Sequence, residues 1–101
     1  MSPEELADLR SQETILTLLA KGDIPTDIAA AEDFSDPLLQ NLYTGLVAGR
    51  SPAVLAEEQP TDAARARVTA ILFANVAEDR NDRLIMAKDC LSGIRRRKQQ
   101  R

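Results

Sequence analysis

Residues 80–101, RNDRLIMAKDCLSGIRRRKQQR, carry the most informative pattern in the chain. The apolar side chains of this stretch recur at steps of three and four residues, at Leu84, Ala87, Leu91 and Ile94. This spacing places them on one face of an α-helix that packs against a core. The next position on that face is Lys98, so the apolar face ends before the chain does. No capping glycine or proline follows, and we therefore expect the helix to extend past its own core.

Start signals and apolar spacing predict four further helices upstream. They cover about residues 3–21, starting at Ser2-Pro3; 37–49, starting at Asp36-Pro37; 52–58, starting at Ser51-Pro52; and 62–77, starting at Thr61. Ser, Thr and Asp side chains accept N–H groups of a first helical turn, and proline suits the first helical position. A short turn is expected near residues 28–30. The loops between these segments are short, which predicts that successive helices pack as neighbours.

The 101-residue chain has the size of one domain, and its apolar content comes mainly from Ala and Leu, with three aromatic residues and four glycines. This composition favours helices over a sheet. We therefore predict an all-α fold, a compact bundle of five to six helices over residues 1–94, followed by a basic helical extension over residues 95–101. The predicted core comprises Leu6, Leu9, Ile15, Leu16, Leu19, Phe34, Leu42, Leu46, Leu55, Val68, Ile71, Leu72, Leu84, Leu91 and Ile94.

Charge is unevenly distributed along the chain. Residues 1–60 carry three Lys and Arg against eleven Asp and Glu, and residues 61–101 carry ten against five. The basic run Arg95, Arg96, Arg97 and Lys98 is the candidate partner-binding site, because such a run can meet an acidic partner or phosphates. It can equally be a solvated helix end, since cations suit the negative pole of the helix dipole. No aromatic residue is interleaved for base stacking, so nucleic-acid contact by this segment is expected to be weak.

Catalytic and metal chemistry is not expected from this sequence. It has no His and a single Cys90, which excludes histidine-based catalysis and a thiolate cluster for zinc. Its glycines form no phosphate-binding loop, and its acidic pairs suit helix caps and solvated surfaces. We interpret Cys90 as a small packing residue, with a reactive thiol as the alternative. The prediction is a non-enzymatic protein without cofactor or metal, soluble and cytoplasmic, with no contact to a membrane.

Three segments together resemble a known family. They are ETILTLLAKGD at residues 13–23, EDFSDPLLQNLY at residues 32–43, and DCLSGIRRRK at residues 89–98. In that order they resemble the C-terminal helicase-binding domain of bacterial DNA primase, the DnaG type. The resemblance implies a helical bundle that binds the N-terminal domain of the replicative helicase and couples priming to unwinding. It also implies that residues 95–101 begin a connector to a helical hairpin that is not in this chain.

Two alternatives remain open at this point. The N-terminal domain of the replicative helicase is similar in fold and also carries an acidic-Phe turn before a helix, although the Arg-rich last helix fits the primase domain better. A small nucleic-acid-binding regulatory protein that uses the basic end is the third possibility. It is weakened because no helix-turn-helix with a polar second helix stands out.

Overall fold

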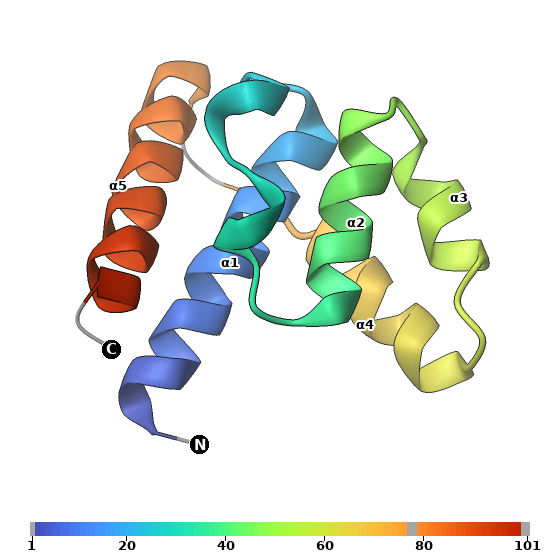
Figure 1. Ribbon diagram of the computed structural model, residues 1–101. Helices are drawn as coiled ribbons and strands as arrows, with labels where there is room; N and C mark the ends of the chain where they lie inside the picture. Colours follow the sequence, from blue (N-terminus) through green and yellow to red (C-terminus); the bar gives the residue numbers. More distant parts are fainter. Residues whose placement is uncertain (1, 77–78, 100–101) are drawn as a thin grey trace.

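The computed structural model describes residues 2–76 and 79–99, and Figure 1 shows how these segments are arranged. Over these residues the chain forms helices and no strand, which confirms the predicted all-α bundle. The elements are α1 (Pro3–Lys21), the 3-10 turns η1 (Thr26–Ile28) and η2 (Ala31–Asp33), α2 (Pro37–Val47), α3 (Pro52–Glu57), α4 (Asp62–Leu72) and α5 (Arg80–Gln99).

The helix starts follow from local capping, as the sequence predicted. The side chains of Ser2, Asp36, Ser51 and Thr61 each accept a backbone N–H of the following turn over 2.8–3.2 Å. Asp79, a cap that the sequence analysis did not single out, accepts the N–H of Asp82 at 3.0 Å and begins α5. Gly22 and Gly49 follow α1 and α2 with φ of 75° and 86°, a conformation that glycine adopts without strain.

Helix α1 lies at the centre of the fold. It packs against α5, α4 and α2, while α3 packs mainly on α4. The segment that holds η1 and η2 crosses α1 between α5 and α2, and it is drawn in teal in Figure 1. Through this arrangement the residues before α2 come to lie beside the last helix of the chain.

The core joins side chains from every α-helix and from the crossing segment. Of the predicted core, the buried members are Ile15, Leu16, Leu19, Phe34, Leu42, Leu46, Leu55, Val68, Ile71, Leu72, Leu91 and Ile94. Phe34 stacks on Tyr43 with 5.0 Å between the ring centroids. Other buried residues, outside the predicted core list, are Leu18, Ile24, Ala29, Leu39, Tyr43, Ala56 and Ala87.

Three members of the predicted core, Leu6, Leu9 and Leu84, are less buried than expected. Leu6 is 43% exposed, because the first turns of α1 extend past α2 and the crossing segment (Figure 1). Val54, an apolar residue of the helix predicted over 52–58, is also exposed, since Leu55 and Ala56 supply the packing face there. Leu9 and Leu84 pack against the rim of the core and are only partly buried.

Helix α4 ends at Leu72, earlier than the predicted 62–77. The hydroxyl of Thr17 on α1 donates to the carbonyl oxygen of Ile71 at 2.6 Å and so satisfies a carbonyl of the last turn. Val76, expected on this helix, lies in the connection to α5, where its carbonyl oxygen accepts Arg83 Nη2 at 3.1 Å. Residue 77 lies outside the described residues. None of the helices over residues 2–76 and 79–99 has the length and apolar character needed to cross a membrane.

Candidate functional site

Arg95, the first residue of the predicted basic site, is engaged inside the molecule. Its Nε donates to Oδ1 of Asp33 at 3.2 Å and its Nη2 donates to Oδ2 at 3.1 Å. The side chain of Asp33 is 3% exposed and that of Arg95 is 52% exposed. The bidentate pair therefore has one face in the core and one face in solvent, and it ties α5 to η2.

The environment of Asp33 favours its charged form. Burial acts to raise the pKa of this carboxyl group, but the hydrogen bonds from Arg95 and from the Ala30 N–H oppose it. The positive charges of Arg95 and Lys98 act in the same direction as these hydrogen bonds. The net result is a pKa below the ordinary value, so Asp33 is ionised at neutral pH and needs its cation. Asp33 in turn raises the pKa of Arg95.

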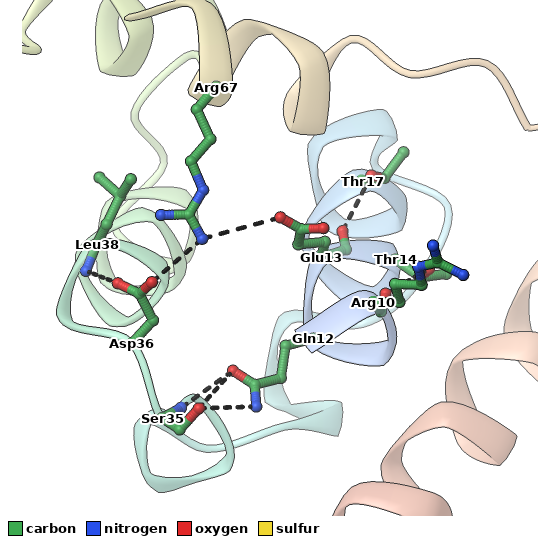
Figure 2. A network of polar contacts seen from close by, with 9 residues as sticks. All are labelled: Arg10, Gln12, Glu13, Thr14, Thr17, Ser35, Asp36, Leu38 and Arg67. Carbon is green, nitrogen blue, oxygen red and sulfur yellow. Dashed lines mark hydrogen bonds and ion pairs between the residues drawn. The ribbon is translucent and has the colours of Figure 1, made fainter. Parts of the chain in front are cut away.

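Arg97 faces α1. Its Nε donates to Oδ1 of Asp8 at 3.1 Å, and its Nη2 donates to the Ser11 hydroxyl at 3.3 Å. Asp8 is buried, and its Oδ2 accepts Nε2 of Gln12 at 2.8 Å. Gln12 is buried as well, and its Oε1 accepts the Ser35 N–H at 3.0 Å, as Figure 2 shows. One polar chain therefore links α5, α1 and the turn before α2.

Lys98 and Arg96 differ in their surroundings. Lys98 Nζ donates to the carbonyl oxygen of Glu32 at 2.8 Å, which adds a second contact between α5 and η2. Arg96 is exposed and forms no hydrogen bond or ion pair within residues 2–76 and 79–99. Helix α5 continues without interruption from Ile94 to Gln99, and the division of the chain after Ile94 stays a prediction.

The predicted partner-binding site is thus divided by the structure. Arg95, Arg97 and Lys98 hold α5 against the bundle, and Arg96 projects from it. The side chains that accept from them, Asp8, Ser11 and Asp33, were not among the sequence candidates, nor was Gln12, which holds Asp8 in place. A partial signal existed, because Asp8 and Gln12 are polar residues one turn apart, in line with Ile15, Leu16 and Leu19 on the apolar face of the same predicted helix. The binding role of the four basic residues remains a prediction.

A second polar cluster centres on Arg67 of α4, shown in Figure 2. Arg67 Nη2 lies 3.1 Å from Oδ2 of Asp36 and 3.9 Å from Oε2 of Glu13. Asp36 also caps α2 through Leu38, so one carboxylate serves both the helix start and the ion pair. An open hollow of about 400 Å³ lies between α1 and α4, and its lining includes Arg67, Glu13 and Arg10. Its charged lining is paired in part, since Arg67 lies within ion-pair distance of Glu13.

A smaller hollow lies between η1 and α5. It has a volume of about 300 Å³ and is lined by Ile28, Lys88, Leu91, Ser92 and Arg95. Its lining combines two apolar side chains with two cations and a hydroxyl. Lys88 and Ser92 are exposed on the outer face of α5 and form no hydrogen bond or ion pair among the described residues. This hollow therefore offers donors that the fold itself does not use.

Cys90 is partly buried on α5 and packs against the core. Burial raises the pKa of its thiol, assisted by the charge of Asp89 and opposed by Ser11 and Arg97. A raised pKa keeps the thiol protonated and favours the packing interpretation over the reactive one. Within residues 2–76 and 79–99, no three Cys, Asp or Glu side chains are grouped in a way that could hold a metal ion.

Comparison with family models, with curated proteins and with solved structures found no match to this chain.

Proposed function

We propose that this chain is a non-catalytic protein-interaction domain of a bacterial primase that binds the N-terminal domain of the replicative helicase in the cytoplasm. The observation that carries the proposal is the contact between two of the three segments on which the resemblance rests. Arg95 and Lys98 of the last segment donate to the carboxylate of Asp33 and to the carbonyl oxygen of Glu32, which belong to the segment at residues 32–43. The first segment contributes Ile15 and Leu16 to the core, against which the other two segments pack.

A rigid helical surface suits a docking role. The bidentate ion pair, the Gln12 link and the capped helix starts fix the relative positions of α1, η2 and α5. A partner that binds such a surface does not have to order it first, which lowers the free-energy cost of association. The hollows described above are open to solvent, so side chains of a partner can enter them.

Calorimetric titration against the helicase N-terminal domain tests the proposal. The present chain and a version extended past Arg101 are compared, because the resemblance implies a further hairpin. We expect saturable binding by both chains, tighter for the extended one. Absence of binding by both chains would overturn the proposed function and leave only the fold.

The nucleic-acid alternative is tested with the variant Arg96→Gln on single-stranded and duplex DNA over a series of salt concentrations. Three of the four cations in the basic run are engaged within the chain, so we expect weak binding that this substitution barely changes. A strong affinity with a salt slope that falls in the variant would favour the nucleic-acid alternative.

A further inference from the structure

We propose that the hollow between η1 and α5 is the docking site for an acidic segment of the partner, which places one carboxylate between Lys88 and Arg95. The inference rests on the proposed function and specifies the surface that function uses. The hollow is bordered on one side by Ile28 of η1 and on the other by Lys88, Leu91, Ser92 and Arg95 of α5. Residues distant in sequence thus form one concave surface with unused donors.

The geometry of Arg95 prepares it for a ligand. Its Nε and Nη2 are bonded to Asp33, which fixes the plane of the guanidinium group. Its Nη1 donates to no acceptor among the described residues, so donors remain while the side chain is already ordered. Lys88 adds a flexible cation two turns earlier on the helix, and the hydroxyl of Ser92 lies between them along the same face. Together they suit a single carboxylate.

The charges around the hollow limit what can bind there. Asp33 lies beneath Arg95, and the charge of Glu32 also acts on Arg95. Asp89 is exposed next to Lys88 in the sequence. These carboxylates leave room for one anionic group but repel a chain of phosphates, which disfavours nucleic acid. The chemistry therefore points to an acidic protein segment.

Apolar surface at the same place supports a protein occupant. Ile28 and Leu91 contribute apolar lining to the hollow, and Ile85, one turn before Lys88 on the outer face of α5, is 59% exposed. An exposed isoleucine beside a cationic hollow fits a partner segment that carries an acidic residue followed within a turn by an apolar one.

The test uses the whole chain with paired variants. Lys88→Glu reverses one charge of the hollow, and Ser92→Trp fills it without changing charge. The matched controls are Arg65→Glu and Thr69→Trp, both at exposed positions of α4. Circular dichroism and thermal melting establish that all four variants fold. Each is titrated calorimetrically with the helicase N-terminal domain, and we expect about a tenfold loss of affinity for the two hollow variants and less than a twofold change for the controls.

A second measurement separates this inference from the proposed function. A synthetic peptide of alternating Glu and Leu is added to ¹⁵N-labelled protein, and we expect amide shifts at Lys88, Ser92 and Arg95 that are lost in 0.5 M NaCl and in Lys88→Glu. If the helicase domain fails to bind while these shifts occur, the docking site for an acidic segment is supported and the helicase domain is rejected as its partner. If the helicase domain binds all variants equally, or if an oligonucleotide rather than the peptide shifts these residues, the docking inference is overturned.

Discussion

At the scale of single residues, the most consequential side chain is Asp33. It is ionised and almost fully buried, and two N–H groups of Arg95 and the Ala30 N–H satisfy its oxygens. A buried charge is tolerated only where hydrogen bonds and an opposite charge replace water. Sequence spacing predicted that Phe34 would be buried but could not reveal the role of Asp33, since its partner lies 62 positions away.

We predict that Asp33→Asn lowers the free energy of unfolding at pH 7 by about 1–3 kcal/mol, because Arg95 loses its ionic partner. The folded-state pKa of Asp33 is below its ordinary value. The ionised Asp33 therefore stabilises the fold fully when the pH is above the ordinary pKa of an aspartate. This stabilisation is lost as the pH falls below that ordinary pKa towards the lower folded-state pKa. Urea unfolding at pH 7 and at pH 3 should show that acidification lowers the free energy of unfolding less in the variant than in the wild type. Glu57→Gln, at an exposed position, is the control. The prediction is contradicted if the free energy of unfolding falls by the same amount on acidification in Asp33→Asn and in the wild type.

The buried amide of Gln12 is the subject of a second prediction at this scale. Gln12→Leu keeps the approximate volume of a buried side chain but removes an acceptor for the Ser35 N–H and a donor to Asp8. We expect a loss of about 1–3 kcal/mol, the usual cost of buried polar groups left without partners. Urea unfolding compares it with Gln59→Leu, because the Gln59 amide donates only to the carbonyl oxygen of Leu55, in the helix just before it. A loss no larger than in this control would mean that water replaces the Gln12 contacts.

At the scale of elements, the starts of α1, α2, α3 and α4 were predictable from the sequence, and the end of α4 was not. Ser2, Asp36, Ser51 and Thr61 act within their own first turns, so the local sequence is sufficient to identify them. The end of α4 depends on Thr17, which comes from another helix. Likewise, apolar spacing identifies the inner face of α1 but not how far its neighbours extend, which is why Leu6 was wrongly assigned to the core.

Thr17→Val tests the junction between α1 and α4. The substitution removes the hydroxyl that donates to Ile71 and leaves a buried carbonyl oxygen without that partner. We expect a loss of about 1–2 kcal/mol by urea unfolding, with faster amide exchange in the last turn of α4. Thr14→Val is the matched control, because the Thr14 hydroxyl bonds only within α1, to the carbonyl of Arg10. Equal effects of the two substitutions would rule out a special role for the junction.

At the scale of the whole molecule, the charge asymmetry of the sequence is used within the fold. Cations of residues 61–101 pair with carboxylates of residues 1–60, as in Arg67 with Asp36, Arg83 with Asp23, Arg95 with Asp33 and Arg97 with Asp8. The sequence predicted the all-α class because composition and periodicity are properties of the whole chain. It could not predict these pairs, since each joins residues that are distant in the sequence and that only the packing of the elements brings together.

The boundary predicted after Ile94 makes the last test. A chain of residues 1–94 lacks Arg95, Arg97 and Lys98, and Asp8 and Asp33 then remain buried without these cations. We expect it to be less stable than a chain of residues 1–99 by about 3 kcal/mol or more, the order of magnitude for removing one side of a buried ion pair. Urea unfolding followed by circular dichroism measures the difference, and failure of the shorter chain to fold agrees with it. Equal stability would instead show that residues 95–99 lie outside the folding unit. The basic end of α5 would then be free to bind a partner. A large loss in the free energy of unfolding would instead show that Arg95, Arg97 and Lys98 are needed to stabilise the fold.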